Sequence, residues 1–244
     1  MILNKQKDPM GLAIADFYKN GVAGRLRVFS PQFEEDEIPV ETLFREYDEM
    51  PEIEQKALQM ASGQILDVGA GAGCHALALQ EMGKDVTAID ISPLSIETIK
   101  KRGVEKAELQ DFFDMAQEEK HYQYDTILML MNGSGIIGKI AKINVFFGYL
   151  DKILAPDGQL LMDSSDLRYI FENEDGSLDI DLAAGYYGEL DYQMQYKRTK
   201  GDSFPWLYID AATLQMYAEE NGFKAEIIAE GEHYDYLARI TRSV

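Results

Sequence analysis

Short apolar runs alternate with amphipathic segments between residues 64 and 166 of this chain. The apolar runs predict strands, in chain order, at 64–69, 85–90, 104–111, 124–135 and 157–166. The segments between them predict helices at 74–83, 92–103 and 139–154. Strands that alternate with helices form right-handed βαβ units, so we expect a mostly parallel sheet with helices on both faces.

The first part of the chain has a different pattern. Asp8 and Pro9 predict the start of a helix that Gly21 ends, and residues 40–63 predict one or two more helices. The acidic stretch 34–40 between them is expected to be a solvated loop. Residues 1–61 are therefore expected to form a helical cap.

The last part of the chain predicts antiparallel pairing. Apolar and polar residues alternate with period two over 189–198, which indicates a strand. A helix that Gly222 ends is followed by two strand-like runs, and a short turn between such runs favours an antiparallel pair. We therefore expect an antiparallel edge at the C-terminal end of the sheet.

The composition narrows the possible partners. Of the 244 residues, 46% are hydrophobic and 27% charged, and 23 basic against 43 acidic residues give a net charge of −20. So acidic a chain makes nucleic acid an improbable partner, since basic residues supply most non-specific affinity for phosphates. The single cysteine, Cys74, excludes an intramolecular disulfide, and no cluster of metal ligands is expected. With no signal peptide and no membrane-spanning run, a soluble cytoplasmic protein is expected.

The stretch ILDVGAGAGCHALAL, residues 65–79, places three alternating glycines between a predicted strand and a predicted helix. Gly69 and Gly71, with an acid at Asp90, partly match the fingerprint of a dinucleotide site, but Cys74 stands where the third glycine is expected. An acid before the loop, Asp67, is an awkward neighbour for a pyrophosphate. S-adenosylmethionine has no phosphate and carries positive charge, so it fits these residues with fewer conflicts.

Five motifs in order resemble those of class I S-adenosylmethionine-dependent methyltransferases. They are DVGAGAG, AIDIS, QDFFD, YDTILMLMNGSG and LDKILAPDGQLLMD, which together cover roughly residues 60–165. The resemblance implies an α/β fold, a Rossmann-like three-layer sandwich with a mostly parallel sheet, an antiparallel C-terminal edge and the helical cap. It also implies a methyltransferase domain over 62–244, in which 171–209 is a substrate-side insertion.

The resemblance implies a set of residues that bind the cofactor. Asp90 matches the acid that takes the ribose hydroxyls, and Asn132 follows the fourth strand, which faces the methyl group in the family. The complete set is Asp67, Gly69, Ala70, Gly71, Gly73, Asp90, Ile91, Asp111, Phe112 and Asn132. Asp111 and Phe112 are expected to meet the edge and the face of the adenine.

Other candidate residues have weaker support. No catalytic residue is assigned, because no Ser-His-Asp or histidine-rich set is visible. The acids Asp163 and Asp166 either contact substrate, with a possible role as base, or belong to a capped loop. His75 is expected to be a surface or boundary residue. Phe17 and Tyr18 are candidates for a lid. Several aromatics are expected to pack a sheet or to line a substrate cavity: Tyr186, Tyr187, Tyr192, Tyr196, Phe204, Trp206 and Tyr208.

These observations predict methyl transfer from S-adenosylmethionine to a small or medium-sized acceptor. The fourth-strand motif lacks the Asn-Pro-Pro-Tyr pattern of enzymes that methylate base nitrogens. Two alternatives stay open from the sequence: an NAD-dependent oxidoreductase on a Rossmann sheet, and a binding protein that keeps the fold and the cofactor without catalysis.

Overall fold

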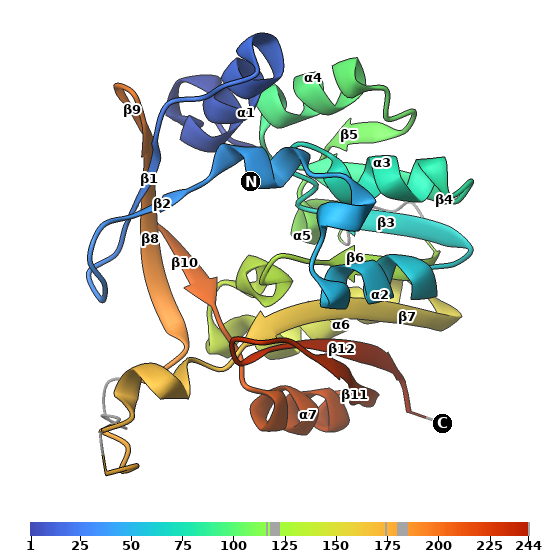
Figure 1. Ribbon diagram of the computed structural model, residues 1–244. Helices are drawn as coiled ribbons and strands as arrows, with labels where there is room; N and C mark the ends of the chain where they lie inside the picture. The colour runs from blue at the N-terminus through green and yellow to red at the C-terminus, as the bar shows by residue number, and fades with distance from the viewer. Residues whose placement is uncertain (116, 118–122, 174, 180–184, 244) are drawn as a thin grey trace.

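A computed structural model describes residues 1–115, 117, 123–173, 175–179 and 185–243 of the chain. Seven strands form the larger sheet in the order β11-β12-β7-β6-β3-β4-β5 (Figure 1). The five strands from β7 to β5 pair parallel, whereas β7-β12 and β12-β11 pair antiparallel. Their bounds are β3 Gln64–Val68, β4 Asp85–Asp90, β5 Ala107–Leu109, β6 Tyr124–Met129, β7 Leu154–Ser165, β11 Phe223–Glu230 and β12 Asp235–Arg242. The mostly parallel sheet and its antiparallel C-terminal edge are confirmed.

Helices cover both faces of this sheet. One apolar cluster joins Leu66 and Ile127 to helices α5, α6 and α7, and a second joins Ile65 and Leu128 to α2, α3 and α4. Neighbouring residues of one strand thus enter opposite clusters, as expected for a strand that is buried on both sides. The helices are α2 Glu52–Met60, α3 Cys74–Glu81, α4 Pro93–Arg102, α5 Phe112–Met115, α6 Ile143–Ile153 and α7 Ala211–Glu220. The three-layer sandwich is confirmed.

Side-chain caps stabilise the starts of two helices. Helix α1 (Pro9–Asn20) begins after Asp8, whose carboxylate accepts a hydrogen bond from Gly11 N at 2.8 Å, and ends at the left-handed Gly21. Ser92 caps α4 in the same way, with its Oγ accepting from Ser95 N at 2.9 Å. Short 3-10 helices fill the connections: η1 Lys5–Lys7, η2 Val40–Phe44, η3 Tyr47–Glu49, η4 Gly133–Ile137, η5 Ile140–Lys142 and η6 Leu167–Phe171.

A second, antiparallel sheet was not predicted. Its order is β10-β8-β1-β2, with β9 paired to β8. The strands are β1 Leu26–Phe29, β2 Asp36–Ile38, β8 Glu189–Tyr196, β9 Thr199–Lys200 and β10 Phe204–Leu207. Strand β8 confirms the period-two prediction, but the helical cap also holds two strands, and the acidic loop at 34–40 contains β2. The reason is tertiary: β1 pairs with β8, far along the chain, and local pattern carries no sign of that partner.

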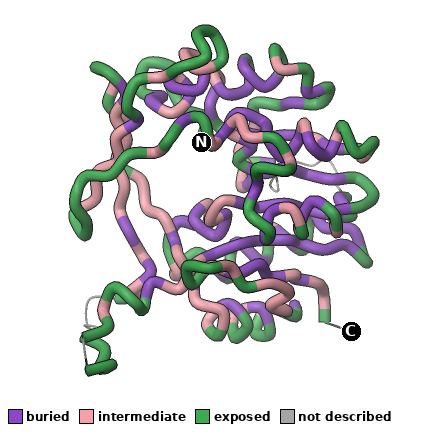
Figure 2. Tube along the Cα trace, in the orientation of Figure 1, coloured by how far each residue is buried: buried purple, intermediate pink, exposed green. Residues whose placement is uncertain are grey.

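The second sheet stands beside the edge of the larger sheet where the parallel strands end (Figure 1). The strands of the larger sheet are mostly buried, whereas the β1–β2 hairpin is largely exposed or half-buried (Figure 2). Of the expected insertion 171–209, residues 174 and 180–184 lie outside the described part, and β8, β9 and β10 belong to the second sheet. The N-terminal segment and the insertion therefore build one structure together.

Candidate active site

The glycine loop turns over the carboxyl end of β3. Gly69, Gly71 and Gly73 have φ angles of 74°, 58° and 84°, a region that L side chains rarely adopt. The amides of Gly69 and Ala70 both donate to Ile89 O, at 2.9 and 3.0 Å, which ties the loop to the end of β4. A β carbon on Gly73 would lie 3.2 Å from Ile99 of α4, so this glycine also allows close packing. The loop thus presents backbone instead of side chains at this edge.

Asp90, the last residue of β4, holds this loop. Its Oδ2 accepts from Gly71 N at 2.8 Å and its Oδ1 from Ser92 N at 2.7 Å. Burial raises the pKa of Asp90 to about 6, against the two amide hydrogen bonds that lower it. Each oxygen keeps further lone pairs, so the carboxylate can still accept two hydroxyl groups of a ligand.

Asp67 lies beneath the loop and is buried. Within the described residues its Oδ2 has no hydrogen-bond partner. Burial raises the pKa of Asp67, while the charge of His75 and the Ala76 amide lower it. An unpartnered carboxylate oxygen beside an amide-rich loop suits a ligand that carries positive charge better than a pyrophosphate.

The sequence suggested that His75 is a surface or boundary residue, but the structure shows that it is buried. It is 5% exposed, and its Nε2 lies 2.8 Å from Oε2 of the equally buried Glu54. Arg45 donates from Nη2 to the same carboxylate. Sequence analysis missed Glu54, although helical periodicity places it on the apolar face of α2 with Leu58 and Ala57.

The three residues predicted to border the adenine, Ile91, Asp111 and Phe112, differ in exposure and in their contacts. Asp111 caps α5 by accepting from Phe113 N at 2.8 Å, and its other oxygen pairs with the ammonium of Met1. Ile91 is 37% exposed. The Phe112 ring is buried and packs against Phe113 and Phe146, so the expectation that its face meets adenine is not supported. The reason is that Phe112 begins α5 with its side chain toward the core, which leaves its backbone as the possible contact.

The turn after β6 carries backbone strain. Met131 and Asn132 have φ angles of 65° and 57°, and two consecutive non-glycine residues in this region are costly. Asp163 fixes the turn, because its oxygens accept from Met131 N at 3.1 Å and Gly133 N at 2.9 Å. Burial raises the pKa of Asp163 to about 6. Asn132 Oδ1 accepts from Ser165 Oγ at 2.8 Å, so the turn is also tied to the end of β7.

Aromatic side chains of the second sheet adjoin this turn. Trp206 lies so close to Gly135 that a β carbon there would come within 1.8 Å of its ring. Phe204 makes an edge contact with Trp206 at 6.1 Å between centroids. Tyr192 and Tyr208 share a hydrogen bond of 3.2 Å, and burial together with the neighbouring Tyr192 raises the pKa of Tyr208 well above its usual value.

Carboxylates continue along the same edge. Tyr187 donates to Asp166 at 2.8 Å, and Tyr186 donates to Asp210, the cap of α7, at 2.7 Å. Arg168 pairs with Asp166, and its side chain is 59% exposed. This edge is therefore rich in hydroxyl groups and carboxylates.

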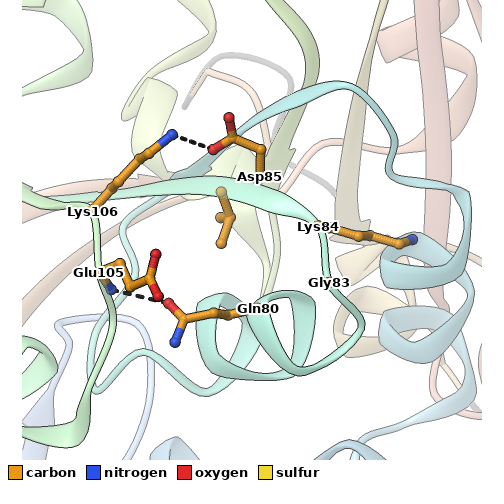
Figure 3. Close-up of a pocket in the computed structure, with 7 residues that line it drawn as sticks. Gln80, Gly83, Lys84, Asp85, Glu105 and Lys106 are labelled. Carbon is orange, nitrogen blue, oxygen red and sulfur yellow. Dashed lines mark hydrogen bonds and ion pairs between the residues drawn. The ribbon is translucent and has the colours of Figure 1, made fainter.

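The remaining candidates lie elsewhere. Phe17 packs on Phe44 at 4.6 Å, and Tyr18 donates to Lys101 O at 3.0 Å. A hollow outlined by Gln80, Lys84, Asp85 and Lys106 lies at the opposite, amino end of β4 and does not adjoin the glycine loop (Figure 3). Among the described residues, no three His, Cys, Asp or Glu side chains are grouped as metal ligands. No helix in the described ranges is long and apolar enough to cross a membrane.

Comparisons with known proteins show the family to which the chain is similar. A family profile described as a methyltransferase domain matches residues 40–226. The chain is 60% identical to an S-adenosylmethionine-dependent methyltransferase from Bacteroides fragilis, solved in complex with S-adenosyl-L-homocysteine. The match covers 100% of this chain and 98% of that one, with a TM-score of 0.93.

More distant structures share the fold alone. The CcbJ methyltransferase from Streptomyces caelestis is 14% identical, with 97% of this chain and 98% of that chain covered and a TM-score of 0.61. KedS8, a sugar N-methyltransferase from a Streptoalloteichus species, is 14% identical over 83% of this chain and 88% of that one, with a TM-score of 0.53. No protein among the curated sequences matches this chain.

Proposed function

This chain belongs to the S-adenosylmethionine-dependent methyltransferases, and we propose that it methylates a small acceptor that is neutral or positively charged. The observation that supports the location of the site is the turn at Met131 and Asn132, strained and held by a buried carboxylate, and the charge of the same edge supports the acceptor class. Strain of this kind is retained where the surrounding structure fixes it, and it clusters at ligand sites. The turn lies between the glycine loop and the aromatic side chains of the second sheet.

We assign the cofactor to the carboxyl edge formed by β3, β4 and β5. Asp90 would accept the ribose hydroxyls, and the glycine loop would pass against the ribose and amino-acid parts. Asp67, buried beneath the loop, would add negative charge near the positively charged amino-acid end. Ile91, Asp111 and the backbone of Phe112 would border the adenine. Asn132, Ala70 and the loop glycines Gly69, Gly71 and Gly73 complete the set.

We assign the acceptor to the space bordered by the strained turn, the end of β7 and strands β8 and β10. The charge of this edge supports the acceptor class. Asp163 and Asp210 place carboxylates there, and the charges of Asp166 and Arg168 compensate each other in an ion pair. A phosphate or carboxylate on the acceptor would face like charges, whereas an amine or hydroxyl group would find acceptors of hydrogen bonds.

Methyl transfer requires little of the protein beyond the correct placement of the acceptor. When bound, S-adenosylmethionine supplies a methyl group that its sulfonium already activates. An acceptor lone pair forms the new bond to carbon while the carbon–sulfur bond breaks, and S-adenosylhomocysteine leaves. The tyrosine and carboxylate groups would orient the acceptor in line with that bond, and Trp206 and Phe204 would keep water away. A base is required only if the acceptor must lose a proton first.

A matched set of acceptors tests the charge argument. The purified protein is incubated with labelled S-adenosylmethionine and three probes, glucosamine, N-acetylglucosamine and glucosamine 6-phosphate, within a wider panel of small amines, alcohols, carboxylates and phosphates. We expect transfer to neutral or cationic members. Transfer confined to phosphates and carboxylates would overturn the proposed acceptor class and leave the cofactor assignment intact.

A further inference from the structure

The second sheet has one apolar face and one polar face. Directly opposed residues of antiparallel strands share a face, and so do residues two apart in one strand. The register therefore places six apolar or aromatic side chains on one face: Leu26, Val28, Tyr192, Met194, Tyr196 and Phe204. On the other face, the cations of Arg27 and Lys200 lie over the ring of Phe29, at 4.8 and 5.5 Å from its centroid. The outer face is thus adapted to water, and the inner face is not.

Other elements cover both ends of the apolar face. At one end, Leu26 and Tyr196 belong to the same apolar cluster as Ala13 of α1, and Tyr196 is 2% exposed. At the other end, the ring of Trp206 lies against Gly135 of η4. Strand β8 is accordingly buried near each end and half-buried between them (Figure 2).

The middle of this face is less covered. Val28, Tyr192, Met194 and Phe204 make up this middle part, the apolar strip, and each of them is half-buried. Met194 packs beside the cluster at α1, whereas the other three belong to no apolar cluster among the described residues. The rings are contiguous, since centroids are 6.3 Å apart for Tyr192 and Phe204 and 6.1 Å for Phe204 and Trp206. Contiguous apolar side chains that the core does not use are typical of a ligand site.

Polar groups border the strip at its Trp206 end. Helix η4 begins directly after Asn132, so this end of the strip adjoins the strained turn. The buried carboxylate of Asp163 holds that turn and adds negative charge there. The hydroxyl groups of Tyr192 and Tyr208 share a hydrogen bond of 3.2 Å. An apolar surface with a few polar groups at one end fits a ligand that has an apolar body and one polar end.

We propose that the methyl acceptor is an amine that carries an aromatic or other apolar ring, and that this ring binds to the apolar strip. The amine would lie at the Trp206 end, beside the strained turn. A sugar would instead place hydroxyl groups against Val28, Met194 and Phe204, where they would lose hydrogen bonds to water. The inference rests on the proposed function, which assigns the acceptor to this side of the molecule.

Trp206, the single tryptophan of the chain, reports binding at the strip directly. Its fluorescence is excited at the red edge of its absorption, where tyrosine does not absorb, with S-adenosylhomocysteine at saturation. The probes are 2-phenylethylamine, ethylamine without the ring, 3-phenylpropionate with a carboxylate in place of the amine, and glucosamine. Probes that leave the fluorescence unchanged are measured by competition with 2-phenylethylamine. We expect 2-phenylethylamine to bind more tightly than each of the others by a factor of about ten or more.

Two variants at neighbouring positions of β8 locate the ring. Met194→Gln introduces a polar side chain of similar length on the strip, and Gln195→Met makes the reverse change on the outer face, opposite Arg27. We expect Met194→Gln to weaken 2-phenylethylamine binding by about fivefold and Gln195→Met to leave it unchanged, with the affinity for S-adenosylhomocysteine unchanged in both. Val28→Thr, which keeps the side-chain shape, should weaken binding in the same direction and serves if Met194→Gln does not fold.

The outcomes separate this inference from the proposed function. Equal affinity for 2-phenylethylamine and ethylamine overturns the inference, as does the absence of any fluorescence change with 2-phenylethylamine at millimolar concentration. Equal weakening by Met194→Gln and Gln195→Met overturns it as well. Tighter binding of 3-phenylpropionate would overturn the amine, and with it the acceptor charge in the proposed function, while the place of the ring stands. Failure of the wild-type protein to bind S-adenosylhomocysteine would overturn the cofactor assignment itself.

Discussion

Replacing Asp90 with alanine tests the cofactor assignment most directly. The change removes the acceptor of Gly71 N and Ser92 N, and with it the proposed acceptor of both ribose hydroxyls. Hydrogen bonds to a charged group are worth about 1.5–3 kcal/mol each. We take the lower end, because each oxygen already accepts one amide. Two lost bonds then cost about 3 kcal/mol, or roughly 150-fold in Kd for S-adenosylhomocysteine.

The assay is calorimetric titration at pH 8, where the carboxyl group is ionised. Asp85→Asn serves as the matched control, since Asp85 lies at the amino end of the same strand and pairs with the exposed Lys106. An analogue of S-adenosylhomocysteine that lacks the 2′-hydroxyl separates ribose contact from loop support. It should bind wild type more weakly than the parent compound does, and Asp90→Ala should hardly distinguish the two.

The same carboxyl group predicts a pH dependence. With a pKa of about 6, only about one tenth of Asp90 is ionised at pH 5, so Kd should rise roughly tenfold between pH 7 and pH 5 if the ionised form binds. Asp90→Asn should lose this dependence. A Kd for Asp90→Ala within threefold of wild type, in a protein that melts at the same temperature, would refute the assignment.

Three further changes extend the test. Gly71→Ala and Gly83→Ala both place a side chain at positive φ with no close contact, so each should cost about 1 kcal/mol in thermal unfolding, but only Gly71→Ala should weaken S-adenosylhomocysteine binding. Gly135→Ala drives a β carbon into Trp206 and should destabilise the fold by about 1–3 kcal/mol and reduce kcat/KM for the acceptor, with cofactor affinity unchanged. The raised pKa of Asp163 favours the folded state below about pH 4, and this contribution to stability is lost as pH rises through about 6. Between pH 4 and pH 7 the free energy of unfolding of Asp163→Asn should therefore rise relative to that of wild type. Denaturant titration at the two pH values measures this difference.

The parallel core and helix α1 could be predicted because their signals are local. Asp8, Pro9 and Gly21 mark a helix by capping chemistry that needs only neighbouring residues, and the structure has that helix at Pro9–Asn20. The parallel pairing of the strands likewise follows from the alternation of short apolar runs with helices. The positions of the glycine loop and of Asp90 at the ends of β3 and β4 follow from the same rule, since parallel strands end at one edge.

The errors arose where distant residues decide the outcome. His75 stands in a helix of small and apolar residues, and nothing within that helix shows that Glu54 lies 2.8 Å away. Phe112 follows an acid at a strand end, as an adenine contact does in the family, but the packing of its ring against Phe146 depends on α6. In both cases the local sequence drew attention to the residue but could not predict which distant side chains surround it.

The second sheet is the largest feature that the sequence did not predict, and it bears on specificity. Strand β1 pairs with β8 from Leu26–Tyr196 to Phe29–Gln193, and β8 pairs with β10, which carries Trp206. In the proposed function, the acceptor side is therefore formed jointly by the N-terminal segment and the 189–207 region. Exchange of the 171–209 region with that of a relative should alter acceptor choice only if the β1 register with β8 is kept, because a shift of one residue would turn Tyr192 and Met194 to the opposite face.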